Sequence, residues 1–370
     1  MCSDESCIDL ITAIIEECHD TYEIKKNQRA VPLVFDKSEK FSFPKSVQEK
    51  DALIVFSKQS VIAVAAELQQ IGIKASMIYG NLPYDVRMNE VKRFVEGETK
   101  VVVATDAIGM GLNLPIRRIV FLETRKFDGH VKRPLNVCEI KQIAGRAGRR
   151  GIFETGYYTS EYRSQAIKRA VEGSVETISY ARMGIPENII YLDMPLSEIL
   201  KRWADVEFTS LYEKADLEED ISLCKKLEAV VSDKKLIYDF IMIGFRTSKP
   251  FLTGLLLKFA VVEERGGAGT DSRINDLVEA AIVPFDDELD NMKMEELEDL
   301  YLIYDLIYAY LRKFDHRDRL GDIIELKRDV SGRIIEYLKT QQLEGKKCHC
   351  CGKMLPWNYP YGKCEDCFFV

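Results

Sequence analysis

The chain has 370 residues, of which 46% are hydrophobic and 30% charged, and 52 basic against 60 acidic side chains give a net charge of −8. This composition excludes a disordered chain and a uniformly basic nucleic-acid coat, although it leaves room for a local basic channel. No apolar run approaches the roughly 20 residues of a membrane span, and the N-terminal sequence MCSDESCIDL lacks the basic stretch of a signal or transit peptide. We therefore expect two or three domains in a cytoplasmic protein without a membrane partner.

The first 45 residues indicate a connector. Apolar residues at helical spacing predict a helix over Ile8–Glu17. The runs Tyr22–Lys26 and Ala30–Phe35 are read as strands or extended connections.

Residues 46–160 alternate short apolar runs with amphipathic helices. Strands are predicted at Ala52–Phe56, Lys74–Tyr79, Val101–Ala104 and Arg118–Leu122, and helices at Ser60–Gln70 and Pro83–Val95. Such alternation is typical of βαβ units around a parallel sheet, so the predicted fold class is α/β. Because ligands bind at the carboxyl ends of parallel strands, we expect Ser57, Gly80 and Thr105 at the functional edge.

Residues 161–343 predict an all-helical domain. The clearest helix covers Leu297–Leu311, whose aromatic stripe is more typical of a core than of a ligand site. Residues 286–299 are rich in acids and indicate a solvated face.

The string KQIAGRAGRRG, Lys141–Gly151, carries the strongest chemical signal. Drawn as a helix, it places Gln142, Arg146 and Arg149 on one face. Two glycines inside a helix cost about 1 kcal/mol each relative to alanine, so close backbone approach explains them better than helix stability. Two arginines on a slim helix suit bidentate binding of phosphate oxygens, and an ordinary exposed basic helix is the alternative.

Three further strand ends support a phosphate-binding edge. VVVATDAIGMGLNLPI, Val101–Ile116, runs from a buried strand into a loop whose glycines allow backbone N–H groups to approach phosphates. LIVFSKQS, Leu53–Ser60, and YGNLPYDVR, Tyr79–Arg87, each place a small polar residue before a helix start, which attracts anions. For each string alone, a purely structural turn is the alternative.

The C-terminal end is rich in cysteine. Four of the ten cysteines form two Cys-x2-Cys pairs separated by twelve residues: Cys348, Cys351, Cys364 and Cys367. This spacing predicts a four-cysteine zinc ribbon or knuckle within residues 344–370, against the alternative of a chance cluster. His349 and Cys350 are expected to be spare, although His349 could substitute as a ligand. Trp357, Tyr359 and Tyr361 lie between the pairs, where packing of the small core is favoured over base stacking.

Taken in chain order, LIVFSKQS with YGNLPYDVR, then VVVATDAIGMGLNLPI, then KQIAGRAGRRG resemble motifs IV, V and VI of superfamily-two helicases. TDAIGMGLNLPIRRIVF with KQIAGRAGRRG is especially similar to the mitochondrial RNA-degradosome helicases of the Suv-three type and their bacterial relatives. The resemblance is strong over residues 50–152, weaker to about residue 340 and loose at the N-terminus. It implies a second RecA-like helicase lobe over 46–160, a helical C-terminal domain over 161–343, and a remnant or connector from a first RecA-like lobe over 1–45. The zinc tail is not a feature of the resemblance.

The resemblance also implies a role for each motif residue. Four residues are expected at nucleic acid: Ser57, Gly80, Arg87 and Thr105. Two are expected beside ATP: Gly111 and Asn113. Three are expected to form the catalytic group at the γ-phosphate: Gln142, Arg146 and Arg149, with Arg149 as the arginine finger.

The sequence contains neither a P-loop GxxxxGK[ST] nor a DExH box, the motifs that hold ATP and Mg²⁺. The string DELD at 287–290 lies in the acidic stretch and is read as a surface coincidence. The chain is therefore interpreted as the C-terminal portion of an ATP-dependent RNA helicase, which should not hydrolyse ATP alone. The alternatives are a non-hydrolysing RNA-binding or adaptor protein and a subunit that completes an ATP site in trans.

The expected partners are single-stranded RNA or DNA, together with a separate P-loop lobe or a nuclease. Salt-sensitive binding of a single strand is expected from six basic residues before the arginine motif: Arg117, Arg118, Arg125, Lys126, Lys132 and Arg133.

Overall fold

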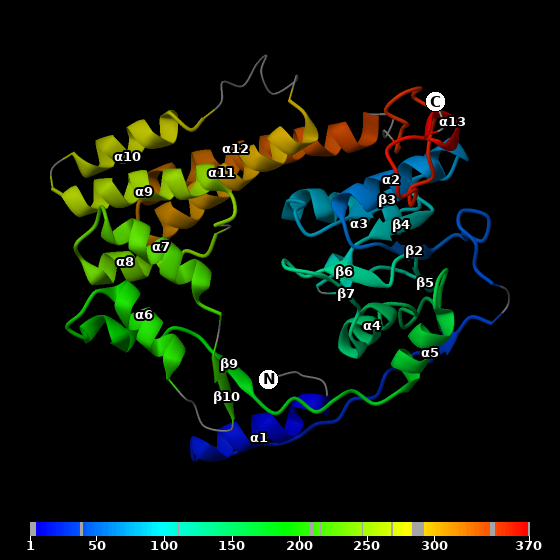
Figure 1. Cartoon of the computed structure of the whole chain (residues 1–370), viewed down its shortest axis with the longest axis horizontal. Coiled ribbons are helices and arrows are strands. Elements are labelled where there is room, and N and C mark those ends of the chain that lie inside the picture. Colours follow the sequence, from blue (N-terminus) through cyan, green and yellow to red (C-terminus); the bar gives the residue numbers. More distant parts are fainter. Residues whose placement is uncertain are drawn as a thin grey trace. The chain divides into compact units, whose positions relative to one another are not determined.

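The computed structural model is shown in Figure 1. It describes residues 5–37, 40–109, 111–206, 211–214, 216–245, 247–267, 269–282, 292–340 and 345–368. The chain forms two compact units: unit 1 contains Met1–Ile24 and Glu176–Arg333, and unit 2 contains Lys25–Val175 and Ile334–Val370. None of the described helices is long and apolar enough to cross a membrane.

Unit 2 contains a six-stranded sheet in which all neighbouring strands are parallel, in the order β1-β8-β5-β2-β4-β3. The strands are β1 (Leu33–Phe35), β2 (Asp51–Ile54), β3 (Ala75–Ile78), β4 (Val101–Ala104), β5 (Arg118–Phe121) and β8 (Gly156–Ser160). The helices beside them are α2 (Lys58–Gln70), α3 (Tyr84–Val95), α4 (Val137–Ala144) and α5 (Ser164–Glu172). The predicted α/β class is confirmed, and we call residues 25–175 the lobe.

The four predicted strands are present because each is a short apolar run that is buried. β2, β4 and β5 are buried at every residue, which explains why, apart from Asp51 and Arg118 at the strand starts, they are apolar without alternation. β1 lies before residue 46, where we expected the lobe to begin, and it pairs with β8 at the edge of the sheet. An antiparallel pair, β6 (Arg125–Phe127) with β7 (Lys132–Pro134), has three residues per strand and was not predicted.

Unit 1 is mainly helical, as expected for most of residues 161–343. Its helices are α1 (Ile8–Glu17), α6 (Leu196–Asp205), α7 (Glu218–Glu228), α8 (Lys234–Ile241), α9 (Pro250–Arg265), α10 (Thr270–Glu279) and α11 (Met294–Lys313). Helix α12 (Leu320–Thr340) begins in unit 1 and ends in unit 2. A parallel pair, β9 (Ala181–Met183) with β10 (Tyr212–Lys214), was not predicted.

The aromatic stripe of α11 is core, as expected. Tyr304 and Tyr310 are fully buried, and the Tyr310 ring stacks on Phe259 with 4.0 Å between ring centroids. The DELD string at 287–290 lies outside the described residues.

The tail, residues 345–368, has little regular structure. It contains one bridge between Lys347 and Met354 and the four-residue helix α13 (Glu365–Phe368). Its contacts assign it to unit 2.

Candidate functional site

Three residues predicted to bind nucleic acid lie at one edge of the sheet. Ser57, Gly80 and Thr105 follow β2, β3 and β4, which are adjacent and parallel, so their carboxyl ends share that edge. Ser57 and Gly80 are exposed, whereas Thr105 is 7% exposed. The Ser57 Oγ accepts the backbone N–H of Ser60 at 3.0 Å and thereby caps α2. The structure brings these residues together, and their binding to nucleic acid stays a prediction.

Two further side chains hold the loops at this edge. Arg87, on α3, donates from Nη2 to the carbonyls of Leu82 at 3.2 Å and Gly80 at 3.4 Å, so it lies beside Gly80. Glu123, which follows β5, was not identified from the sequence. Its Oε2 accepts the N–H of Phe56 at 2.7 Å and its Oε1 accepts the hydroxyl of Ser60 at 3.1 Å. An acidic residue directly after a buried strand is the signal that could have identified it.

Residues 145–150 form a turn, which we call the arginine turn. Helix α4 ends at Ala144, and Gly148 has a φ of +77°, so the predicted single helix over Lys141–Gly151 is wrong beyond Ala144. A Cβ at Gly148 would lie 2.8 Å from both Cα and N of Gly156, the first residue of β8. The glycine is therefore required by close backbone approach within the lobe itself.

The arginine turn contacts the loop between β4 and β5. Arg149 donates from Nη1 to the carbonyl of Asn113 at 3.0 Å. Arg146 donates from Nη2 to the carbonyl of Gly109, which also accepts the Gln142 amide at 3.4 Å. The three predicted catalytic residues therefore lie against the loop predicted to approach the nucleotide.

A pocket of about 380 Å³ lies between this loop and the arginine turn. Apolar residues from the loop line part of it, and the remaining lining residues are Asn113, Gly145, Arg146, Gly148, Arg149 and Arg150. The described lining contains three guanidinium groups and no carboxylate, which suits an anion with several oxygens. Gly111 is exposed in the loop with a φ of +70° and is not among the lining residues.

Arg29 holds the arginine turn and was not identified from the sequence. It donates from Nη1 to the carbonyl of Gly145 at 2.6 Å, from Nη2 to that of Ala147, and from Nε to that of Val31 at 2.6 Å. The last carbonyls of a helix lack intrahelical partners and favour a cation. Partial desolvation of its guanidinium, in a residue whose surface is otherwise exposed, lowers the pKa of Arg29. A single arginine in an extended segment, 116 residues before Gly145, gives no sequence signal.

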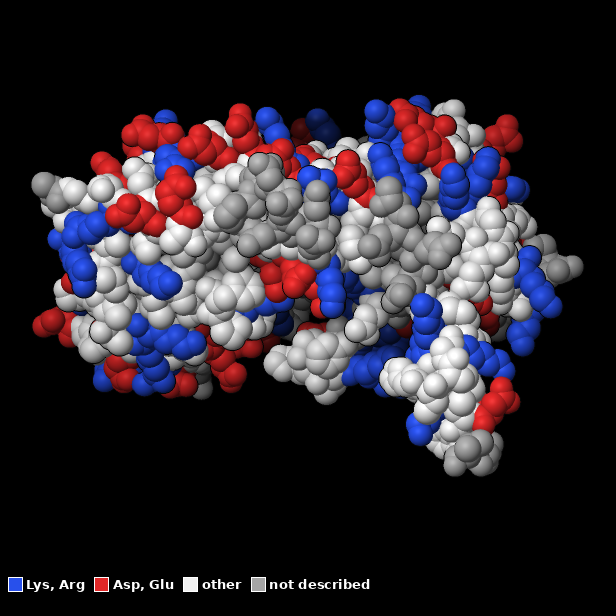
Figure 2. Space-filling view, turned by 90° about the horizontal axis from the view of Figure 1, so that it is seen from above, with Lys and Arg blue, Asp and Glu red and all other residues white. Residues whose placement is uncertain are grey.

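The six basic residues expected to attract nucleic acid differ in availability, and the expectation is wrong for Arg118. Arg118 is 5% exposed because it is bound inside unit 2, where Nε and Nη2 contact the carboxylate of Asp51 at 3.0 and 2.7 Å. Its other partners are Asp36 at 2.7 Å and the Ser46 carbonyl at 2.8 Å. Figure 2 shows one face of the molecule, on which basic and acidic side chains are interspersed without a continuous basic surface.

Two more of the six form ion pairs with Glu139, on α4. Lys126 lies 2.6 Å and Arg133 2.8 Å from Glu139 Oε1. Burial alone raises the pKa of Glu139, but the hydrogen bonds from Arg133 and Lys126 prevail and lower it to about 2. Arg117, Arg125 and Lys132 are exposed.

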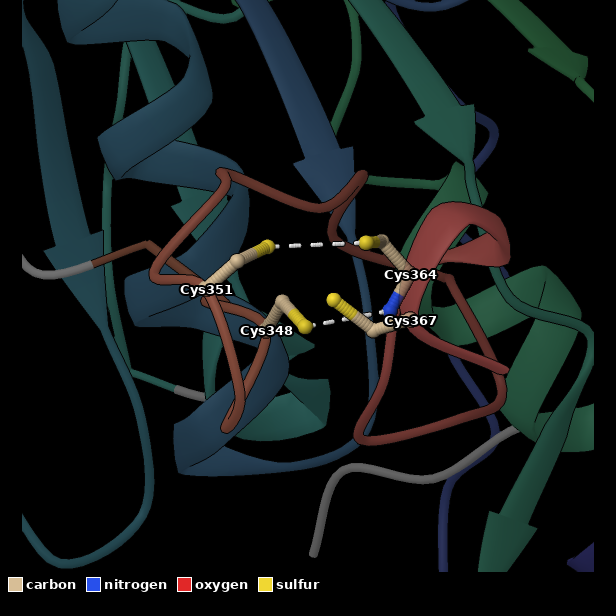
Figure 3. Close-up of side chains that lie close together, drawn as sticks. All are labelled: Cys348, Cys351, Cys364 and Cys367. Atoms are coloured by element: carbon tan, nitrogen blue, oxygen red, sulfur yellow. Dashed lines mark hydrogen bonds between the residues drawn. The ribbon is translucent and has the colours of Figure 1, made fainter. Parts of the chain in front are cut away.

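The four predicted metal ligands converge in the tail (Figure 3). The Sγ atoms of Cys348, Cys351, Cys364 and Cys367 all lie within 4.8 Å of one another, and in the described part of the chain no other such group could hold a metal. A tetrahedral Zn²⁺ with Zn–S bonds of about 2.3 Å separates its sulfurs by about 3.8 Å, so this spacing fits zinc.

The backbone of the tail favours the thiolate form of one ligand. The N–H of Cys364 donates to Cys348 Sγ at 3.2 Å, and backbone N–H groups of Cys364 and Cys351 lower the pKa of Cys348 to about 6. The thiolate is the form that binds a metal. His349 and Cys350 lie outside the four-sulfur group.

Comparison with known proteins identifies relatives of this lobe. Residues 35–151 match the family model of the helicase conserved C-terminal domain. The mitochondrial ATP-dependent RNA helicase SUV3 of Candida albicans is 33% identical over 286 residues, covering 71% of this chain and 39% of that protein. The mitochondrial SUV3 of Saccharomyces cerevisiae is 31% identical and the mitochondrial SUPV3L1 of Mus musculus 25% identical, covering 49% and 82% of this chain.

The chain spans less than half the length of these relatives, because it covers 26% of the Saccharomyces cerevisiae protein and 41% of the mouse protein. All three are named as mitochondrial, which contradicts our expectation of a cytoplasmic protein. That expectation rested only on the composition of the first residues, which is a weak indicator of location.

Proposed function

We propose that this chain supplies the nucleic-acid edge and the arginine finger of an ATP-dependent RNA helicase of the Suv3 type, because it matches the helicase conserved C-terminal domain and is similar to a SUV3 helicase over most of its length. The observation that supports this most directly is the pocket in which Arg146 and Arg149 lie beside Asn113. The printed sequence holds neither a P-loop nor a DExH box, so the proposal requires a P-loop lobe outside the printed residues to hold most of the ATP and Mg²⁺ contacts.

Arg149 is proposed as the arginine finger. An arginine has five N–H donors, and the bond from Nη1 to Asn113 uses one of them, so the same guanidinium can bind phosphate oxygens. In the transition state, negative charge spreads over the equatorial oxygens of the γ-phosphoryl group, and a guanidinium there is worth about 10³–10⁵ in rate. Arg146 and Gln142 are proposed to face the same ATP from the end of α4, with Asn113 and Gly111 beside the nucleotide.

Single-stranded RNA is the proposed ligand of the strand edge. Ser57 and Thr105 are proposed to contact its backbone, with Gly80 and Arg87 nearby. The start of α2 provides backbone N–H groups for phosphate oxygens. Such contacts make binding strongly dependent on salt concentration.

An ATPase assay tests the proposal. The chain is incubated with single-stranded RNA and Mg-ATP, alone and with the recombinant P-loop lobe of a Suv3-type relative. We expect no turnover alone and RNA-stimulated turnover in the mixture, which Arg149→Ala reduces about 10³-fold. Arg169→Ala, which removes an exposed arginine on α5, is the matched control.

The outcomes separate the candidate functions. Turnover by the chain alone that is lost with Arg149→Ala would show that no second lobe is needed. An inactive mixture that still binds RNA would favour the second candidate, a non-hydrolysing RNA-binding or adaptor protein.

We also propose that one Zn²⁺ is bound by the four converging cysteines. A segment of this length, with two cysteines among its few buried residues, cannot bury enough apolar surface to fold without a metal.

A further inference from the structure

The tail makes specific contacts with the lobe inside unit 2. The backbone N–H of Trp357 donates to Oε2 of Glu67, on α2, at 3.0 Å. The amide of Asn358 donates to the hydroxyl of Tyr162 at 3.1 Å. These pairs are separated by 290 and 196 residues in the sequence, so they join distant parts of the chain.

The Trp357 ring is the apolar anchor of this contact. It packs edge-on against Phe43, with 6.2 Å between ring centroids and 83° between ring planes, and the residue is only 9% exposed. Close approach continues at Gly345, where a Cβ would lie 3.5 Å from the Ala66 Cβ on α2. Trp357 therefore packs against the lobe, beyond the small core of the tail to which we assigned it.

The anchor lies in the part of the chain that the two cysteine pairs enclose. Trp357 lies in the segment between the two Cys-x2-Cys pairs, two residues after Leu355, which packs with Cys348 and Cys364 in the tail core. A core of this size does not order a chain by burial alone, whereas a metal bound by four thiolates does.

We propose that Zn²⁺ in the four-cysteine site acts as an intramolecular clamp, in which the metal orders the tail and the ordered tail binds α2 and Phe43 through Trp357. This inference rests on the proposed zinc site. Because α2 begins beside Ser57 at the strand edge, the metal and that edge are connected through a single helix. Coupling of this kind is reciprocal, so a lobe that cannot bind the tail must also hold zinc more weakly.

Zinc content and hydrogen exchange test the clamp on the full chain. We expect one zinc per chain by mass spectrometry of the metal. Removal of zinc with a chelator should raise amide exchange at least tenfold in the tail and in the second half of α2. Helix α5, which makes no hydrogen bond with the tail in the described structure, should exchange unchanged.

Two variants place the effect at the interface. Phe43→Ala changes only the lobe, yet it should weaken zinc binding at least tenfold in a chelator competition. Trp357→Ala should weaken zinc binding and deprotect α2 to a similar extent. Tyr361→Ala is the matched control, because this residue lies in the same segment but is 55% exposed, and it should change neither readout.

The results that overturn the inference are distinct. Zinc that binds normally, with α2 exchange unchanged on its removal and zinc affinity unchanged by Phe43→Ala, refutes the clamp and leaves the metal site. Absence of zinc after purification without chelators refutes both. Neither outcome affects the proposed roles of the arginine turn and of the RNA edge, which have their own assay.

Discussion

Replacing Arg118 with leucine should lower the free energy of unfolding of the lobe by about 3 kcal/mol. Arg118 and Asp51 are both almost fully buried and share two hydrogen bonds, and Arg118 also binds Asp36 and the Ser46 carbonyl. Breaking a buried pair by removing one partner costs about 3–5 kcal/mol, because the remaining charge stays buried. In the variant, Asp51 still accepts the hydrogen bond from the N–H of Gln48, at 2.8 Å, so we expect a loss at the lower end of this range.

The loss should depend on pH. Burial raises the pKa of Asp51, and the hydrogen bonds from Arg118 oppose that rise. Without Arg118 the folded state binds a proton more tightly than the unfolded state does. The stability of the variant should therefore increase as the pH falls towards 4 and decrease again as the pH rises.

Hydrogen exchange of the β2 and β5 amides measures this loss, because it reports opening of the lobe independently of unit 1. A loss of about 3 kcal/mol corresponds to roughly 100-fold faster exchange through lobe unfolding. Arg117→Leu is the control: Arg117 is exposed and lies over the Tyr157 ring at 5.7 Å, so its replacement should cost less than about 1 kcal/mol. Equal effects of the two replacements would refute the reasoning that burial makes this ion pair essential.

Three further substitutions test other parts of the lobe. Gly148→Ala should lower the free energy of unfolding, measured in urea, by about 3 kcal/mol, because the new Cβ would lie 2.8 Å from the Gly156 backbone. The control is Gly151→Ala, where φ is a similar +81° but no atom lies within 4 Å of the new Cβ, so the loss should be about 1 kcal/mol. Equal losses would contradict the steric argument. Glu139→Gln should destabilise the lobe at pH 7, and its difference from the wild type should disappear as the pH falls from about 5 to about 2. The reason is that a carboxylate whose pKa is lowered in the folded state stabilises the fold above its unfolded pKa of about 4.3 and loses this contribution as the pH falls. Thermal melts between pH 5 and pH 2 in which the difference stays constant would contradict this explanation. Ser57→Ala should lower the free energy of unfolding by about 1 kcal/mol, because the N-cap of α2 is lost, and it should weaken single-stranded RNA binding measured by fluorescence anisotropy. Ser57→Asn should restore the stability, because asparagine also caps a helix. Unchanged RNA affinity in Ser57→Ala would show that Ser57 is not part of the proposed RNA edge.

Features that depend on neighbouring residues were predictable from the sequence. Three of the four predicted strands contain an apolar run of four or more residues, and the spacing of the cysteines indicated a cluster that the structure brings within 4.8 Å. Features that depend on distant residues were not predictable. The arginine motif was drawn as a helix because nothing in its own sequence shows that Gly148 packs against Gly156. The burial of Arg118 requires the partner Asp51, 67 residues earlier.

The tail is synthesised well after the lobe that it contacts. The last strand of the sheet ends at Ser160, and Trp357 follows roughly 200 residues later, which at about 5–20 residues per second takes roughly 10–40 s on the ribosome. During this interval the sheet can be complete while Phe43 and the second half of α2 still lack their cover. The nascent lobe therefore passes through a stage in which the Phe43 ring is not yet covered by Trp357.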